Sequence, residues 1–220
     1  MGARAWPCLR RWAALAVVAA LSVGVAGSAQ ALPPPGTQSV TVGCWNSVYG
    51  QLASDWRSPS TGAIVAGPIA FPYLRELAAH PSGPGVSTAT SYAVRQGLAP
   101  ALKTLVVVSA GTVVRLRIPT AERGRVSLDY TYVQTGWEIN KQGIGPYFRV
   151  ADGASQVTFR ACSSGSGVER GGGGPTYFAG GFIVAGAQCA RIEIYTSTST
   201  QPLQRDIPFG VSQHSCPAIG

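Results

Sequence analysis

Few residues in this chain could carry out acid–base or nucleophilic chemistry. Among its 220 residues are two histidines, His80 and His214, and nine acidic side chains. A Ser-His-Asp triad needs a histidine set between a serine and a carboxylate, and the G-x-S-x-G motif of many hydrolases is absent. We therefore expect no enzymatic site. The enzymatic alternative is a secreted hydrolase built on His80, with Asp55 or Asp129 and a serine.

The cysteines are the second group of reactive side chains. Cys8 precedes the apolar N-terminal run, and the remaining four are Cys44, Cys162, Cys189 and Cys216. An even number in an exported chain favours disulfides over metal or redox chemistry. We predict the pairs Cys162–Cys189, on strands close in sequence, and Cys44–Cys216, joining the two ends of the domain.

We predict neither a metal nor a cofactor. The sequence has no C-x-x-C motif, which a zinc ribbon or a thioredoxin-like site would need. A copper site of the electron-transfer type needs two histidines, a cysteine and a weak axial ligand such as methionine. The only methionine is Met1, so copper binding is not expected either.

The N-terminus has the three parts of a secretory signal peptide. Basic residues Arg4, Arg10 and Arg11 precede an apolar run over 12–27, and Ala29-Gln30-Ala31 forms an A-x-A cleavage site. We predict a cleaved signal peptide over 1–31, a proline-rich leader over 32–38, and a secreted or envelope-associated protein. Its contact with the membrane would then be transient, through the signal peptide alone.

The rest of the chain shows the pattern of short β-strands. Apolar residues alternate with polar ones at period two, and 28 glycines and 16 prolines supply turns. We predict one domain over 39–220, an antiparallel β-sandwich of immunoglobulin-like type. It would have one short helix within 71–80, and 45–100 could be an elaboration. The predicted strands lie at 39–44, 105–108, 113–118, 126–132, 147–150, 157–159, 177–184, 191–194 and 207–209.

The stretch 159–209 organises this prediction. Two apolar runs carry Cys162 and Cys189, and a loop with four consecutive glycines, 171–174, separates them. We interpret them as the closing strands of the sandwich, joined by a hairpin loop and a disulfide. Within the second run, Gly180-Gly181 indicates a β-bulge or a close approach of two backbones.

Two segments of the chain resemble a known group of proteins. Residues 105–132 include an AGT turn, and the C-terminal half carries the motifs F-R-A-C, F-A-G-G-F and I-P-F-G before Cys216. In these motifs the chain resembles a group of uncharacterised exported proteins of high-GC Gram-positive bacteria. The resemblance covers about half of the chain and implies export and a small domain, but no activity and no catalytic residue.

Charge and aromatic content favour binding over chemistry. The formal net charge is +8, and removing Arg4, Arg10 and Arg11 leaves 14 basic against 9 acidic residues, or +5. Such a surface attracts anionic polymers, but the basic residues do not cluster as in a nucleic-acid-binding protein. We predict a non-enzymatic binding or structural module whose partners are anionic envelope polymers or wall glycans. The candidate ligand contacts are Trp45, Trp56, Trp137, Arg115, Arg117, Arg123 and Arg125.

Two alternatives remain beside this prediction. Most of the aromatic side chains could simply fill the core and its rim. A protein-inhibitor or surface-assembly role would show as an exposed apolar patch or an unpaired sheet edge. The sequence leaves the oligomeric state and the ligand open.

Overall fold

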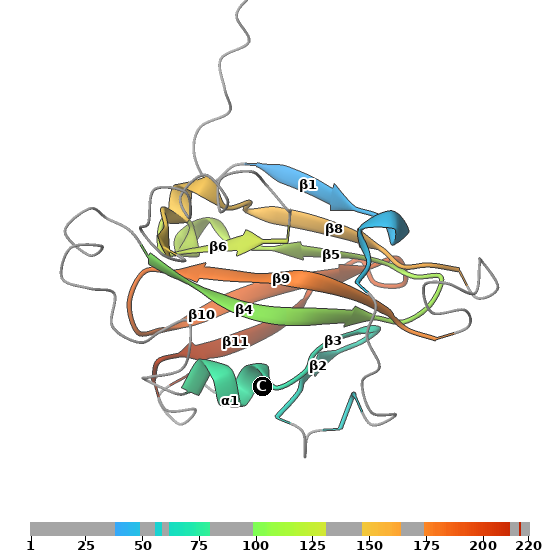
Figure 1. Ribbon diagram of the computed structural model, residues 1–220, viewed down its shortest axis with the longest axis horizontal. Helices are drawn as coiled ribbons and strands as arrows, with labels where there is room; N and C mark the ends of the chain where they lie inside the picture. Colours follow the sequence, from blue (N-terminus) through green and yellow to red (C-terminus); the bar gives the residue numbers. More distant parts are fainter. Residues whose placement is uncertain are drawn as a thin grey trace, which may run out of the picture. The chain divides into compact units, whose positions relative to one another are not determined.

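The alternating apolar segments form two β-sheets in the computed structural model of the chain (Figure 1). The structure describes residues 38–48, 56–58, 62–79, 99–130, 147–163, 174–211 and 216. The predicted signal peptide, the leader up to residue 37, Trp137, His80 and His214 lie outside the described residues. Within the described part of the chain, no helix has the length and hydropathy needed to cross a membrane.

Sheet A contains five strands in the order β1, β8, β5, β10 and β11. Their bounds are β1 Ser39–Val42, β8 Gln156–Arg160, β5 Val113–Arg117, β10 Gln188–Thr196 and β11 Leu203–Phe209. β1 pairs with β8 in parallel, whereas the other neighbours in this sheet are antiparallel. Sheet A is therefore mixed, and the immunoglobulin-like part of our prediction is not confirmed.

Sheet B follows the order β2, β3, β4, β9 and β6, with β7 paired to the start of β4. The bounds are β2 Ile64–Ala66, β3 Ile69–Phe71, β4 Ala99–Val108, β9 Thr176–Val184, β6 Val126–Asp129 and β7 Tyr147–Phe148. The predicted short helix is confirmed as α1, Leu74–Ala79. The described residues also include the 3-10 turns η1 Cys44–Asn46, η3 Thr120–Glu122 and η4 Val150–Asp152.

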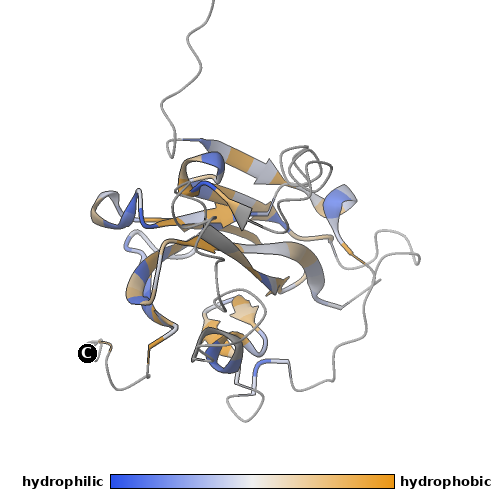
Figure 2. Cartoon of the chain, turned by 60° about the vertical axis from the view of Figure 1, so that its left-hand side comes forward, coloured by the Kyte–Doolittle hydropathy of each residue, from blue (hydrophilic) through white to orange (hydrophobic). Residues whose placement is uncertain are grey.

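The core lies between the two sheets because each strand directs alternate side chains inward. Bands of high and low hydropathy alternate along the strands in Figure 2. Phenylalanine rings join the layers: Phe159 of sheet A lies 5.0 Å from Phe178 of sheet B, between ring centroids. Phe182 lies 5.4 Å from Phe209 in the same sense. The mainly β, sandwich-like prediction is therefore confirmed at this coarser level.

The glycine pair on β9 shows which of two predictions is right. The ladder between β4 and β9 runs without interruption, with Lys103 opposite Gly181 and Thr104 opposite Gly180. There is therefore no bulge at the pair. A Cβ at Gly181 would collide with the carbonyl oxygen of Leu102, and one at Gly180 would collide with Tyr130 and the Asp129 carbonyl oxygen. The close approach of backbones is confirmed.

The predicted disulfide pairing is wrong, because the observed bridges are Cys44–Cys162 and Cys189–Cys216. Cys162 follows β8 and Cys189 lies on β10, and β5 separates those two strands. They also lie toward opposite ends of β5: Arg160 pairs with Val113, whereas Glu193 pairs with Arg117. Two strand spacings alone exceed the Cα separation of about 7 Å that a disulfide tolerates.

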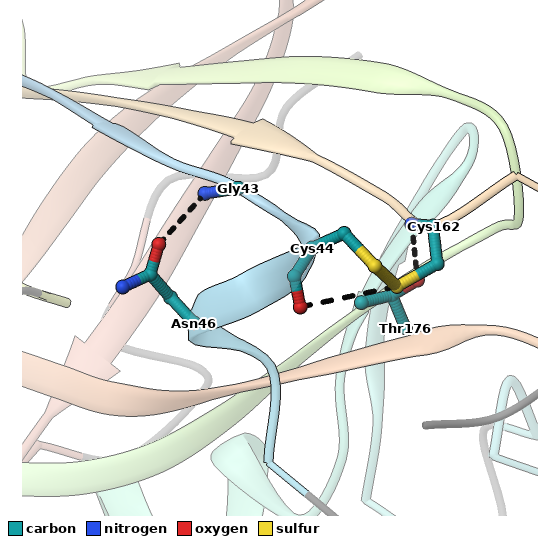
Figure 3. Close-up of a disulfide and its surroundings, with 5 residues drawn as sticks. All are labelled: Gly43, Cys44, Asn46, Cys162 and Thr176. Carbon is teal, nitrogen blue, oxygen red and sulfur yellow. Dashed lines mark hydrogen bonds between the residues drawn. A yellow bond between two sulfur atoms is a disulfide. The ribbon is translucent and has the colours of Figure 1, made fainter. Parts of the chain in front are cut away.

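The parallel pairing of β1 and β8 explains the first observed bridge (Figure 3). Val42 pairs with Phe159 at the ends of the two strands, so the residues that follow both strands emerge side by side. Cys44 and Cys162 then lie 4.9 Å apart between Cα atoms. The backbone N–H of Cys162 donates a hydrogen bond to Thr176 Oγ1, over 2.8 Å, which attaches this corner to the start of β9.

The hairpin predicted around the four glycines is also wrong. β8 belongs to sheet A and β9 to sheet B, so the segment between them connects the two layers. The true hairpin partner of β10 is β11, with Cys189 opposite Pro208. The second disulfide joins β10 to Cys216, which follows β11 in the chain.

Candidate functional site

The outer face of sheet A carries the charged and aromatic groups that could bind a ligand. Along β5, Val114 and Leu116 are fully buried, whereas Arg115 is exposed and Arg117 half-buried. On β10, Ile192 and Ile194 point inward, and Glu193 and Tyr195 point outward. We call Arg115, Arg117, Glu193 and Tyr195 the Arg115–Tyr195 cluster.

Strand register brings the cluster together. Arg115 lies directly opposite Tyr195, and Arg117 directly opposite Glu193, and directly opposed residues share a face of the sheet. The Arg115 guanidinium carbon lies 4.4 Å from the centroid of the Tyr195 ring. That of Arg117 lies 5.0 Å from the same ring. One aromatic ring thus holds two guanidinium groups through cation–π contacts.

Glu193 connects the other members of the cluster. Arg117 Nε donates a hydrogen bond of 2.6 Å to Glu193 Oε2, and Tyr195 Oη donates one of 3.0 Å to the same oxygen. The hydrogen bond to Glu193 raises the pKa of Arg117. Burial, followed by the hydrogen bond to Glu193, raises the pKa of Tyr195. The ring therefore stays neutral, and Arg117 stays charged, over the physiological pH range.

Arg115 differs from Arg117 in having no acidic partner among the described residues. Its guanidinium rests on the Tyr195 ring, which leaves its N–H donors available. Arg160 is exposed on β8 and pairs with Val113, diagonal to Arg115. Diagonal neighbours lie roughly 7–8 Å apart between Cα atoms. Two cations without a described acidic partner therefore stand on one face, in a geometry suited to carboxylate or phosphate groups.

The other two predicted arginines lie in the turn between β5 and β6. Arg125 Nη2 donates a 2.7 Å hydrogen bond to Glu122 Oε2, so its charge is compensated. Arg123 is exposed, and its Nε donates a long hydrogen bond of 3.4 Å to the Ile118 carbonyl oxygen. The four predicted arginines therefore lie in two places: Arg115 and Arg117 on the face of sheet A, and the other two in the turn that follows β5.

Of the three predicted tryptophan contacts, Trp45 lies apart from the cluster. Trp45 in η1 is 85% exposed, the most exposed large hydrophobic side chain among the described residues. It follows β1, which β8 separates from β5. Trp56 is half-buried, with the Arg57 guanidinium carbon 5.4 Å from its ring centroid. Trp137 lies outside the described residues.

Sequence reasoning missed Tyr195 and Glu193 as members of a site. The sequence did indicate their orientation. Glu193 and Tyr195 alternate with the isoleucines of this strand, as Arg191 does, so their side chains lie on the face opposite the isoleucines. The sequence could not show that β5 and β10 are neighbouring strands, since Arg115 and Tyr195 are 80 positions apart in the chain.

The described residues contain no candidate metal site. No three His, Cys, Asp or Glu side chains among them gather in a way that could hold a metal ion. His80, on which the hydrolase alternative depends, lies outside the described residues, and that alternative stays a prediction.

Comparisons with protein-family models, curated proteins and solved structures give no match for this chain. The role of the cluster is therefore inferred from its geometry.

Proposed function

We propose that the chain is a secreted, non-enzymatic binding module that holds anionic polymers of the cell envelope or extracellular space on the outer face of sheet A. Two disulfides indicate an oxidising compartment, and the N-terminal pattern of residues 1–31 favours export. The net charge of +5 that remains after removal of Arg4, Arg10 and Arg11 supplies a long-range attraction for polyanions.

The observation that carries the proposal is the state of Arg115. When a surface arginine binds a ligand, the conformational entropy that its long side chain loses normally offsets much of the interaction energy. Here the Tyr195 ring holds the guanidinium at 4.4 Å, so part of that ordering is complete before a ligand arrives. Since Glu193 already accepts hydrogen bonds from Arg117 and Tyr195, the N–H groups of Arg115 can donate to an external anion.

The surroundings of Arg115 favour an extended ligand over a small one. Two rows of polar side chains cross the sheet: Thr41, Thr158 and Arg115 form one, and Ser39, Gln156 and Arg117 the other. Gln156 Nε2 donates a 2.8 Å hydrogen bond to Ser39 Oγ, which orders the second row. A face of this kind can contact successive units of a chain-like ligand, and each contact contributes modestly.

The test is retention of the purified protein on an immobilised anionic polymer as salt increases. We expect Arg115→Ala to weaken binding by about tenfold, the value of one lost charge-assisted hydrogen bond. Arg149→Ala is the matched control, because Arg149 is exposed, carries the same charge and directly follows β7, which pairs with β4 of sheet B. We expect that control to change binding by less than about twofold, as for a screened surface charge.

Two polymers distinguish the ligand chemistry: a polyuronate carries carboxylates and a polyol phosphate carries phosphodiesters. Retention of either that depends on Arg115 supports the proposal. Equal losses for Arg115→Ala and Arg149→Ala would show that net charge alone is responsible, and absence of salt-sensitive retention on both polymers would overturn the proposal.

A further inference from the structure

Opposite charges face each other on the outer side of sheet B without meeting. Lys103 on β4 lies opposite Gly181 on β9, and Gly181 lies opposite Asp129 on β6. All three positions share one face of the sheet, and Gly181 contributes no side chain. The Cα atoms of Lys103 and Asp129 are therefore about 9.6 Å apart, two strand spacings.

Neither charge is compensated by a described residue. No ion pair or side-chain hydrogen bond joins Lys103 or Asp129 to another part of the described chain. Lys103 is exposed, whereas Asp129 is half-buried. Burial raises the pKa of the Asp129 carboxyl. An acid that is partly desolvated and unpaired is costly to the fold, which points to a role in binding.

An apolar pocket of about 210 Å³ opens beside Lys103. It is lined chiefly by Pro72, Tyr73, Lys103, Leu105, Ala179 and Gly180. The small residues on β9 form the floor, since Ala179 lies opposite Leu105 and Gly180 opposite Thr104. The volume corresponds to roughly seven water molecules, enough for one leucine or phenylalanine side chain.

Tyr73 lines this pocket and has an unfavourable backbone conformation. Its φ is 59°, and it is the one described residue other than glycine with a positive φ. Bulky residues rarely occupy this left-handed region, and such outliers gather at ligand-binding sites. The residue is 45% exposed, so packing into the core does not account for a tyrosine at this turn.

We propose that this site binds a free α-amino acid with an apolar side chain. Lys103 receives the carboxylate, Asp129 receives the ammonium, and the side chain enters the pocket against Tyr73 and Leu105. The ligand's ammonium nitrogen and its farther carboxylate oxygen are roughly 3.5 Å apart by bond lengths. The Cα atoms of Lys103 and Asp129 are about 9.6 Å apart, and the long, flexible stem of Lys103 can bring its ammonium within about 2.8 Å of the ligand's carboxylate while Asp129 accepts a hydrogen bond from the ligand's ammonium.

A zwitterion suits the site better than an ion of one sign. A carboxylate alone would satisfy Lys103 but bring a second negative charge toward Asp129. An amine alone would leave Lys103 unpaired and near a like charge. The amino acid compensates both charges at once, and its apolar side chain adds the burial that gives affinity.

The test is calorimetric titration of the folded protein with leucine and two analogues that each lack one charge, 4-methylpentanoate and isopentylamine. We expect leucine to bind at least about tenfold more tightly than either analogue, the value of one charge-assisted contact. Lys103→Met keeps the aliphatic stem and should weaken leucine binding by about tenfold, and Asp129→Asn should do the same.

The analogues then separate the two charges. Asp129→Asn should leave 4-methylpentanoate binding unchanged or slightly stronger, and Lys103→Met should do so for isopentylamine. Equal affinity for leucine and 4-methylpentanoate would overturn the proposal, as would no binding of leucine, phenylalanine or their D-enantiomers.

Tyr73→Gly is a further variant that should lose leucine binding without losing the fold. Glycine adopts a positive φ without strain, so this variant should fold while its affinity for leucine falls. Arg115→Ala should bind leucine like the unaltered protein, because Arg115 lies on sheet A. Loss of polymer binding and loss of leucine binding are thus independent results.

Discussion

The ring of Tyr130 packs against the backbone of Gly180. Asp129 pairs with Gly181 at the end of the β6–β9 ladder, so the next residues, Tyr130 and Gly180, meet on the core side. The same ring contacts Phe159 edge-on, with centroids 5.1 Å apart. An aromatic ring laid over a cross-strand glycine covers an otherwise bare stretch of backbone, and this is why glycine stands at that place in F-A-G-G-F.

Alanine at either glycine of the pair should destabilise the fold. Gly180→Ala would drive a methyl group into Tyr130, and Gly181→Ala would drive one into the Leu102 carbonyl oxygen. We expect losses of about 1–3 kcal/mol each in the free energy of unfolding, the usual range for overpacking. Gly43→Ala is the control, because nothing lies within 4 Å of a Cβ there. Urea unfolding measures all three, and an equal effect at Gly43 would contradict the steric explanation.

Tyr130 should limit stability at alkaline pH. Its hydroxyl is buried and has no hydrogen-bond partner among the described residues, and burial followed by the charge of Asp129 raises its pKa well above 10.0. A raised folded-state pKa means that the stabilisation is complete below about pH 10 and is lost as pH rises beyond it. Tyr130→Phe removes this loss and the orphaned hydroxyl. We expect the variant to be as stable as the parent at neutral pH, or more so, and to resist alkali better; parallel alkaline unfolding curves would refute this.

The two disulfides should differ in their contribution to the free energy of unfolding. Cys44–Cys162 closes a sequence separation of 118 residues, and Cys189–Cys216 one of 27. Loop-closure entropy then gives about 5 kcal/mol for the first and about 3.5 kcal/mol for the second. Replacing each pair with alanines and measuring unfolding in urea should show the larger loss for Cys44 and Cys162. Peptide mapping without reduction checks the pairing directly, and a fragment linking Cys162 to Cys189 would refute it.

Asp129→Asn should stabilise the protein at neutral pH. Because burial raises the folded-state pKa of this carboxyl above its ordinary value of 3.8, the contribution of Asp129 to stability is full below that value. It is lost as pH rises through the folded-state pKa. Asparagine cannot ionise and avoids the loss. The variant should be more stable than the parent at pH 7, and the difference should shrink below about pH 4; a constant difference would show that the carboxylate charge is not its cause.

Local pattern predicted much of the fold and part of the site. Alternation on β5 identified the strand and placed Arg115 and Arg117 on the face opposite Leu116, as the structure confirms. The proline and apolar spacing near Leu74 located α1. Four cysteines following a predicted signal peptide predicted two disulfides, and the structure contains two. The strand and the helix depend on neighbours within a few positions, which is the range over which periodicity carries information, and the presence of disulfides followed from the number of cysteines.

What the amino-acid sequence determined by itself was therefore the kind of element, its inward face and the presence of cross-links. Only the tertiary structure decided which elements are neighbours. The parallel pairing of β1 with β8 brought Cys44 to Cys162, and the β5–β10 pairing brought Tyr195 to Arg115. The order of β4, β9 and β6 set Lys103 facing Asp129 across a glycine. Strand order depends on packing of the shared core and on hydrogen bonds between distant segments, and neither leaves a local trace in the sequence.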